Sequence, residues 1–394
     1  MRWIFFAAPV FLLYAFFCFY IGIRLLGFLR CFFPFLKAGF YWPLFAVFCS
    51  LMLAAGFVRS NNLRFLNTAA SLWMAVILYL LMPLVISEFV RLILFFAGKK
   101  IPNLNIYTFG AVLLTCAIFI VYGAFNVHSI KRADYNVTLN GTGAGIRVAL
   151  ISDLHIGSMI GKSQIKRIVD AVNSAEPDMV CITGDIFDGH IDSIKDLEGV
   201  ISVLRMINAP LGVYACLGNH DIDRMSFSGN KTERIEEILK AADVILLKDE
   251  SHKIREDLYI AGRKDVRPIG LNAERKTASE LLGGINENSS SSFRGTIIVM
   301  EHQPVEFPQL EEAGADLVLS GHTHKGQVFP GGFITRRMFG RMGAADYGYW
   351  RGKTMQAVVT SGAGFWGPPV RIGTNSEVAV IEIKFLLGEN DEIQ

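Results

Sequence analysis

The sequence has 394 residues, of which 52% are hydrophobic, and a mean hydropathy of +0.37, which is high for a soluble protein. Its 38 basic and 36 acidic side chains leave a formal net charge of +2. Nucleic-acid binding usually demands a concentrated basic surface, so we expect no nucleic-acid partner.

The excess of apolar residues lies near the N-terminus, where we expect a membrane region. A transmembrane helix needs about 20 mostly apolar residues to cross the hydrocarbon core of a bilayer. Four stretches meet that length, at residues 3–29, 40–58, 66–96 and 106–125. Pro83 lies in the middle of the third stretch and is expected to kink that helix or divide it.

Charged residues near these stretches bear on orientation and on function. Basic residues are slightly more frequent on the side that carries the N-terminus and the rest of the chain, which favours a cytoplasmic second domain. Glu88 is the one acidic residue within the stretches, and an acid in a membrane invites a functional interpretation. Its place near Arg91 instead favours an ion pair at the membrane interface.

After a glycine-rich run at residues 140–145, short apolar runs alternate with amphipathic segments, which is typical of the α/β class. We therefore divide the chain into a transmembrane region of about four helices (1–130), a linker (131–145) and an α/β domain (146–394). Apolar residues recur with helical spacing at 165–172 and 235–242. The expected strands cover residues 147–152, 179–183, 213–217, 244–247, 258–261, 296–300, 317–319, 357–360 and 378–383.

Polar side chains follow five of these strands, at the point where each strand ends. In α/β sheets, ligands bind beyond the carboxyl ends of the strands, so these side chains can converge although they are far apart in the sequence. A single histidine is more often a core or surface residue, but five at strand ends, beside acidic and amide side chains, indicate a site. The residues are Asp153, His155, Asp185, Asn219, His220, Asp221, His302, His322 and His324.

These residue types point to metal ions. Carboxylate and amide oxygens combined with imidazole nitrogens suit Mn, Fe or Zn, whereas an all-oxygen set would suit Ca or Mg. Two cations about 3.5–4 Å apart, bridged by one carboxylate, can activate a water and neutralise charge on a phosphoryl group. Asp185 is the candidate bridge. Glycines stand directly before three site residues, at Gly184, Gly218 and Gly321, where they permit close approach of the backbone.

Five blocks of this sequence resemble, in order and spacing, the signature of the calcineurin-like metallophosphoesterases. The blocks are Asp153-Leu-His155, Gly184-Asp185, Gly218-Asn219-His220-Asp221, His302 and Gly321-His322-Thr323-His324. The resemblance covers about residues 146–385. It implies a four-layer α/β/β/α sandwich with a dinuclear centre of divalent ions, for which Mn is the first expectation and Fe or Zn are the alternatives.

The same resemblance implies a role for each of these residues. One metal would be held by Asp153, His155, Asp185 and His324, and the other by Asp185, Asn219, His302 and His322. His220 would not be a ligand, but would donate a proton to the leaving oxygen or stabilise its charge. Asp221 would orient the imidazole of His220.

Two later segments resemble a narrower branch of the family. The run 321–327 and the loop 361–371 are similar to the membrane-associated bacterial branch often labelled YkuE-like, which commonly has Gly where this chain has Lys325. Some members of that branch are similar to enzymes that cleave the pyrophosphate of UDP-2,3-diacylglucosamine in lipid A synthesis. The candidate substrate contacts are Lys325, Trp366 and Arg371, with further aromatic and basic residues that include Phe333 and Arg336.

Three functional hypotheses follow. The first is hydrolysis of a phosphoester or pyrophosphate bond on a membrane lipid, with UDP-2,3-diacylglucosamine as its sharpest version and the bacterial inner membrane as its place. Its partners would be the lipid bilayer and a phosphorylated, lipid-linked substrate. The second is a phosphodiesterase or phosphatase on soluble nucleotides or phosphoproteins, anchored by its helices. The third is a non-catalytic membrane sensor on the same scaffold, against which the intact ligands argue.

Overall fold

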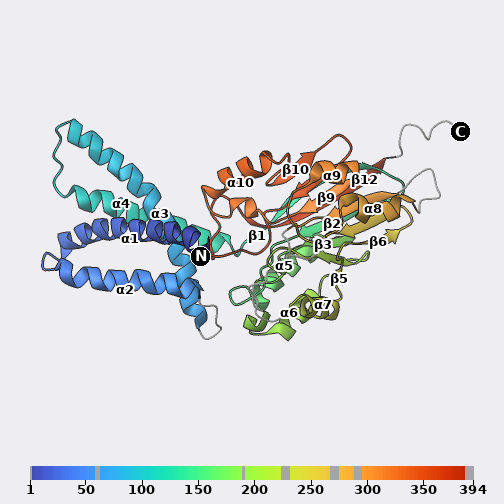
Figure 1. The fold of residues 1–394 in the computed structure, drawn as a ribbon, viewed down its shortest axis with the longest axis horizontal. Coiled ribbons are helices and arrows are strands. Elements are labelled where there is room, and N and C mark those ends of the chain that lie inside the picture. The colour runs from blue at the N-terminus through green and yellow to red at the C-terminus, as the bar shows by residue number, and fades with distance from the viewer. Residues whose placement is uncertain are drawn as a thin grey trace. The chain divides into compact units, whose positions relative to one another are not determined.

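The computed structural model describes residues 2–57, 63–188, 191–222, 231–266, 275–287 and 295–386, apart from the side chains of residues 2–7. The chain divides into two compact units. The helical unit comprises Met1–Phe125 and Gly367–Val370, and the α/β unit comprises Asn126–Trp366 and Arg371–Gln394. The first holds four long helices, and the second holds two β-sheets with their covering helices (Figure 1).

Each of the four N-terminal helices is long and apolar enough to cross a membrane, which agrees with the four expected spans. Large apolar side chains are exposed on them, such as Leu12 at 71% and Phe65 at 88%, as expected for surfaces that face lipid. The third helix runs through Pro83 without a break, so of the two expected outcomes, a kink or a division, the division is wrong. Neighbouring groups within a membrane can satisfy the carbonyl that proline leaves free. The helices are α1 (Arg2–Phe32), α2 (Ala38–Phe57), α3 (Arg64–Phe96) and α4 (Leu104–Asn126).

The second unit contains two mixed six-stranded sheets. The first has the order β1-β12-β2-β3-β4-β5 and the second β10-β11-β9-β8-β7-β6. In each sheet four neighbouring strands are parallel, β2 to β5 in one and β11, β9, β8 and β7 in the other. The strands are β1 (Ile130–Asn140), β2 (Ile146–Ile151), β3 (Met179–Thr183), β4 (Val213–Cys216), β5 (Ile245–Leu246), β6 (Glu250–Arg255), β7 (Leu258–Gly262), β8 (Thr296–Met300), β9 (Leu317–Ser320), β10 (Gly348–Arg351), β11 (Gln356–Val359) and β12 (Ser376–Leu386).

Three apolar layers hold this unit together as an α/β/β/α sandwich (Figure 1). Alternation along β8 shows the arrangement, because Ile298 and Met300 pack between the sheets while Ile297 and Val299 pack against helices. The expected amphipathic helices are confirmed as α5 and α7. The first sheet is covered by α5 (Lys162–Asn173), α6 (Leu197–Leu204) and α7 (Lys231–Ala241), the second by α8 (Ala278–Glu287) and α9 (Phe307–Glu312), and α10 (Gly331–Gly340) follows β9.

The structure corrects the expected linker at 131–145. Most of it is β1, which pairs in parallel with β12 over its whole length, and its Val137 and Leu139 are buried between the sheets. The strands β6 and β10 were likewise not among the expected strands. All three missed strands lie at sheet edges, where one side of the strand has no neighbour and polar residues are tolerated. The apolar alternation that indicates a strand is therefore weak in them.

Candidate metal centre

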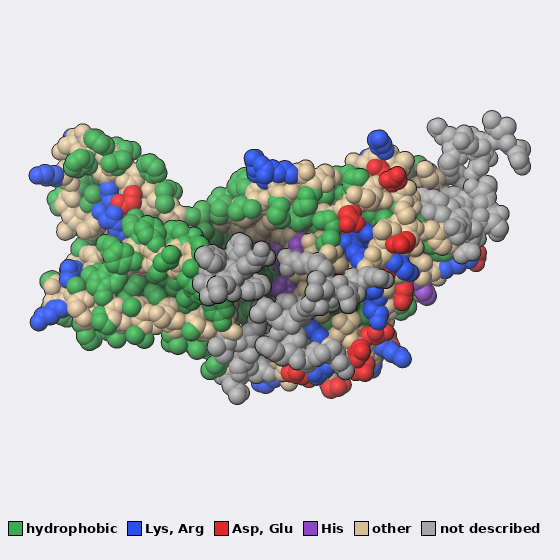
Figure 2. Space-filling model, in the orientation of Figure 1, with side chains coloured by type: hydrophobic (Ala, Val, Ile, Leu, Met, Phe, Trp, Pro, Cys, Tyr) green, Lys and Arg blue, Asp and Glu red, His purple; other side chains and the backbone are tan. Residues whose placement is uncertain are grey.

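The candidate ligands follow five strands that run parallel to their neighbours in the two sheets. Parallel strands end at the same edge of a sheet, so the side chains just beyond them can meet. Asp153 and His155 follow β2, Asp185 follows β3, Asn219 follows β4, His302 follows β8, and His322 and His324 follow β9. The histidines can be seen gathered on one face of the molecule in Figure 2.

The backbone at this edge is strained. Five candidate ligands adopt positive φ angles between 45° and 70°, a region that residues other than glycine rarely enter. Such conformations cost roughly 1–3 kcal/mol each and cluster at functional sites, where the surrounding structure enforces them. The residues are Asp153, His155, Asp185, His322 and His324.

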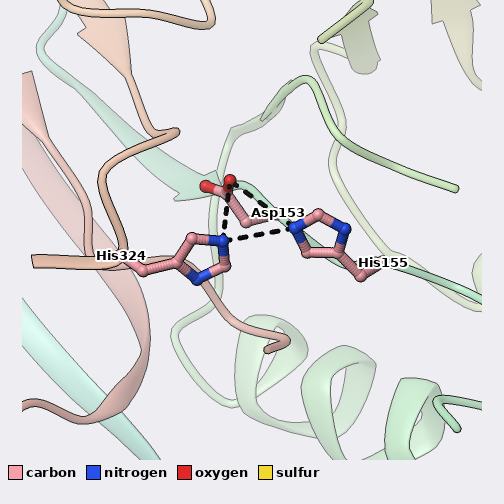
Figure 3. A group of neighbouring side chains, drawn as sticks. All are labelled: Asp153, His155 and His324. Carbon is pink, nitrogen blue, oxygen red and sulfur yellow. Dashed lines mark hydrogen bonds and ion pairs between the residues drawn. The ribbon is translucent and has the colours of Figure 1, made fainter. Parts of the chain in front are cut away.

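One group of ligand atoms comes from Asp153, His155 and His324 (Figure 3). The two Nε2 atoms of the histidines lie 3.2 Å apart, and Asp153 Oδ1 lies 3.4 Å from Nε2 of His324 and 4.0 Å from Nε2 of His155. All three atoms point at a common centre. Two imidazole nitrogens and one carboxylate oxygen that converge in this way can share one cation.

A second group comes from Asp185, His302 and His322. Nε2 of His302 lies 3.3 Å from Asp185 Oδ2 and 3.3 Å from Nδ1 of His322. The other ring nitrogen of His302 lies 2.7 Å from the carbonyl oxygen of Thr183. Donation to that carbonyl uses Nδ1, so Nε2 is the ring nitrogen that faces the centre of the group.

Asp185 connects the two groups. Its Oδ2 atom lies 3.3 Å from His302 Nε2 and 3.8 Å from His155 Nε2, so one carboxylate oxygen faces ligands of both groups. Its Oδ1 atom accepts a hydrogen bond of 2.7 Å from the backbone N–H of His220. A carboxylate held in this position can bridge two metal ions.

Two glycines leave room for these carboxylates. A Cβ atom on Gly218 would lie 2.3 Å from both the backbone nitrogen and Oδ1 of Asp185. A Cβ atom on Gly321 would lie 2.0 Å from Ser152 Oγ and 2.5 Å from Asp153 Oδ2. Real Cβ atoms do not approach other atoms so closely, so any larger residue would displace a ligand.

The residues present fit a pair of divalent ions. Among the described residues, no hydrogen-bond donor serves Asp153 Oδ1 or Asn219 Oδ1, although both atoms are buried. Such orphaned oxygens are costly unless a cation or water meets them. Burial lowers the pKa of His155 to about 4 and also lowers the pKa of His324, which keeps both imidazoles in the neutral form that binds metal.

The pKa of Asp185 is set by opposing effects. Burial disfavours its charge, but attraction to His302 in its protonated form, together with a hydrogen bond from that ring, outweighs burial and holds the pKa of Asp185 well below its usual range. Burial raises the pKa of Asp153 to about 6, and repulsion from the charge of Asp185 adds to that effect. Of the two carboxyl groups, Asp185 is therefore the one whose charge is held more strongly.

The structure assigns a different carboxylate to His220 from the one expected. Asp221 is fully buried and accepts hydrogen bonds from the backbone N–H groups of Gly218, Ile186 and Phe187 at 2.8–3.1 Å, so its role is to hold the loops after β3 and β4. Asp188 Oδ1 instead lies 3.8 Å from His220 Nδ1. The expected pairing with Asp221 is wrong, because adjacent side chains on a bent backbone point in different directions.

Asp188 was thus missed as a functional residue, although the sequence carries a signal for it. It stands three residues after Asp185, on the same loop beyond β3, and it forms a compact group with His155 and His220. A loop that leaves the sheet edge can return a second carboxylate to the site.

Arg371 does not lie where a substrate contact would. It is fully buried, and its guanidinium donates to the carbonyl oxygens of Ser361 and Gly364 at 2.7–3.2 Å. One of its nitrogens also lies 3.2 Å from Nδ1 of His324. The expected phosphate contact is therefore replaced by a structural role, in which Arg371 ties the 361–364 loop to a metal-ligand histidine.

Trp366 and Lys325 remain exposed enough to meet a substrate. The ring of Trp366 lies 5.7 Å from the ring of His220, and half of this residue is exposed. Lys325 directly follows His324, and its Nζ lies 3.8 Å from the ring centre of Tyr347. Lys325 also lines a small cavity of about 140 Å³ together with Phe329, Phe333 and Arg336 among others.

An α/β/β/α sandwich with two His–Asp groups that share one carboxylate defines the class of dinuclear metallohydrolases. The family model of the calcineurin-like phosphoesterases matches residues 146–326. The chain therefore carries a calcineurin-like metallophosphoesterase domain, and it is a metal-dependent phosphoesterase. Members of the family to which this domain belongs hydrolyse phosphoesters with divalent metal ions.

Curated relatives come from bacteria and animals. An uncharacterized metallophosphoesterase of Campylobacter jejuni is 28% identical over 75% of this chain and 76% of that protein. A transmembrane protein with a metallophosphoesterase domain from Danio rerio is 30% identical over 69% of this chain, and the match spans 62% of the relative. The uncharacterized metallophosphoesterase YkuE of Bacillus subtilis is 25% identical over 61% of this chain and 79% of that protein.

Solved structures resemble the chain only distantly. A dimetal phosphatase from Danio rerio shares 14% identity, with coverage of 54% of this chain and 86% of that chain and a TM-score of 0.32. A likeness at that level carries no argument about substrate. Together with the four apolar helices, the transmembrane relatives indicate a membrane protein.

Proposed function

We propose that this protein hydrolyses a phosphoester or pyrophosphate bond on a membrane lipid, with UDP-2,3-diacylglucosamine as the sharpest version of the substrate. The observation that carries the chemistry is the position of Asp185 between the two groups of ligands. The proposal includes Mn as the metal, the bacterial inner membrane as the location, and an orientation in which the α/β unit faces the cytoplasm.

The chain's own residues divide the work. When bound, the two metal ions supply an activated water and positive charge for the phosphoryl oxygens. Asp153, His155 and His324 would hold one ion, and Asn219, His302 and His322 the other, with Asp185 shared. His220 Nδ1 faces Asp188, so its Nε2 is left to give a proton to the leaving oxygen. The ring of Trp366 lies 5.7 Å from that of His220, beside the position of this proton transfer.

Apolar surface beside the site supports a lipid substrate. On and around α10 the side chains of Phe333, Ile334, Met338 and Met342 are 45–69% exposed, and Figure 2 shows hydrophobic side chains gathered over this helix. Phe329 and Phe333 also line the cavity that contains Lys325 and Arg336. A cavity that combines cationic and aromatic side chains suits an anionic group on an apolar body.

The test is metal-supplemented turnover by the full-length protein in detergent. The panel contains UDP-2,3-diacylglucosamine, the same nucleotide sugar without acyl chains, a bis-aryl phosphodiester and an aryl phosphomonoester. We expect kcat/KM for the acylated substrate to exceed that of its deacylated counterpart by at least about tenfold, since burial of each CH₂ contributes about 0.8 kcal/mol. Equal values for the two would refute the lipid proposal. Cleavage of the aryl diester alone would also refute it, but would support the assignment as a phosphoesterase.

The alternative substrate class, soluble nucleotides or phosphoproteins, makes the helices a simple anchor. Deletion of the helices separates the two, but the cut should fall after residue 125 and not after residue 130. Asn126 donates to the carbonyl oxygens of Arg371 and Thr374, and Val127 is fully buried in the second unit. Undiminished turnover of the true substrate by this truncated form would favour the anchor.

A further inference from the structure

The helical unit contains a cluster of charged residues that the phosphoesterase reaction does not use. Glu88 on α3 is the only acidic residue among residues 1–125. It forms a hydrogen-bonded ion pair with Arg24 of α1, and its other oxygen lies 3.9 Å from Nε of Arg91. Arg91 also donates to Thr108 of α4. The ion pair expected within α3 is thus part of a cluster that joins three helices.

The cluster carries an uncompensated positive charge. Two guanidinium groups face one carboxylate, which leaves a net charge of +1. Within the part of the chain that the structure describes, Nε of Arg24 and Nε of Arg91 have no hydrogen-bond acceptor, although both are buried. Excess charge and unpaired donors are expensive inside a membrane region, and a cluster that retains them is a candidate binding site for an anion.

Two adjacent cavities give the cluster the shape of a lipid site. The polar cavity, of about 180 Å³, is lined by Arg24, Arg91, Ser87, Asn105 and Thr108 among others. A larger cavity of about 670 Å³ shares the α1–α3 face, and apart from Glu88 and the Tyr20 hydroxyl its lining is apolar. That lining consists of Phe16, Phe17, Tyr20, Leu81, Met82, Val85, Glu88, Phe89 and Leu92. Glu88 stands at the join, because it lines the larger cavity and contacts Arg24 of the smaller one.

The depth of the cluster fits a headgroup. Arg91 lies five residues before the end of α3, and Thr108 lies four residues after the start of α4. At 1.5 Å per residue both are about 6–8 Å from a helix end, where the phosphate layer meets the hydrocarbon core. Arg24 lies eight residues before the end of α1, about 12 Å from it, and its long side chain can extend toward the same layer. Figure 2 shows acidic and basic side chains side by side among the hydrophobic ones of this unit.

We propose that the helical unit binds an anionic phospholipid, with its phosphodiester at Arg24 and Arg91 and one acyl chain in the apolar cavity. A phosphodiester carries one negative charge, which matches the excess charge of the cluster, and its oxygens accept from guanidinium donors. The size of the larger cavity lies within the range of about 300–1,000 Å³ that is usual for ligand pockets. This site needs neither metal nor turnover, so its fate is independent of the proposed substrate.

The experiment measures lipid retention by the full-length protein in neutral detergent, by native mass spectrometry. Phosphatidylglycerol is compared with phosphatidylcholine of the same acyl chains, and dimethyl phosphate serves as the soluble phosphodiester. We expect one phosphatidylglycerol per chain, bound at least tenfold more tightly than phosphatidylcholine, and no displacement by dimethyl phosphate at equal concentration. Equal binding of the two lipids would overturn the proposal, and displacement by dimethyl phosphate would show a soluble-anion site instead.

Two variants with opposite expected effects on lipid binding test the assigned position of the lipid phosphate. Arg91→Gln keeps the Arg24–Glu88 ion pair but removes the excess charge, and should weaken phosphatidylglycerol binding about tenfold, the worth of one charge-assisted hydrogen bond. Glu88→Gln adds to the excess charge and should tighten binding. Arg30→Gln, on the exposed end of α1, is the matched control and should change nothing. A loss shared by Arg30→Gln, or no loss in Arg91→Gln, would refute the assigned site. If Arg91→Gln does not fold, the direction of the Glu88→Gln effect decides.

Discussion

The two units of this protein differ in the backbone that carries the charged residues of their sites. In the α/β unit the charged residues of the metal centre stand on bent segments just past strand ends, as with Asp153 and Asp185. They are almost fully buried among partners from distant parts of the chain. In the helical unit, Arg24, Glu88 and Arg91 stand on regular helix faces and keep 20–35% of their side-chain surface exposed.

This difference separates a site built for chemistry from one built for binding. Strained loops and buried partners fix ligand atoms in one arrangement, which catalysis by positioned groups requires. Long side chains that remain partly exposed can adjust to a headgroup at little cost, but they are held less firmly than the buried metal ligands. Substitutions should therefore affect turnover steeply in the first unit and ligand affinity modestly in the second.

The largest effect is expected from Asp185→Asn. The amide keeps the shape of the side chain but loses the charge that faces both groups of ligands, so kcat/KM should fall by about 10³-fold or more, since the metals supply several kcal/mol of charge stabilisation. Metal content measured by mass spectrometry should fall from two ions per chain. Lipid binding by the helical unit should stay unchanged, because the proposed lipid site lies on α1, α3 and α4 and shares no residue with the metal centre.

An Asp185→Asn protein that retained both metals and most of its turnover would contradict the claim that turnover depends steeply on single residues of the metal centre. It would show that the carboxylate is not shared between the ions. Circular dichroism of the variant serves as the folding control, and Asp170→Asn on the exposed face of α5 is a matched substitution that should leave both readouts unaltered.

His220→Ala is expected to have the next largest effect, and one that depends on the leaving group. A general acid contributes about 10²–10⁴-fold, but only where the departing oxygen needs a proton. The loss in kcat should therefore be large for an alkyl phosphoester and small for a nitrophenyl ester, whose leaving group departs as an anion. Metal content should remain at two ions. An equal loss for both esters would mean that His220 acts in another way.

Much of the phosphoesterase site was predictable because strand ends leave a clear pattern in the sequence. Apolar runs followed within three residues by Asp, Asn or His marked five of the twelve strands among the described residues, and the structure brings these side chains together. The edge strands were not predictable in the same way, since β6 is largely polar and exposed. The contacts of Arg371 were also hidden, because the sequence does not show that the 361–364 loop folds over it.

In the helical unit the sequence predicts where the helices lie, but not which helices contact each other. Hydropathy located all four helices to within a few residues, because length and apolar content are local properties. Which helices contact each other is not local, so the sequence offered Arg91 as the partner of Glu88 while the structure adds Arg24, 64 residues away. The cavities beside this cluster depend on the same helix contacts.

The smallest expected effect distinguishes two carboxylates that the sequence could not tell apart. Asp188→Asn removes the charge that faces His220 Nδ1, and should lower kcat about tenfold, as loss of an orienting partner typically does, with little change in stability. Asp221→Asn replaces one of two buried oxygens, which together accept three backbone hydrogen bonds, by an NH₂ group that cannot accept, and should cost about 1–3 kcal/mol of folding free energy. Turnover per folded molecule should be nearly unchanged in Asp221→Asn. Thermal unfolding and alkyl-ester kinetics on both variants decide the matter, because the opposite pattern would return the orienting role to Asp221 and reduce Asp188 to a loop residue.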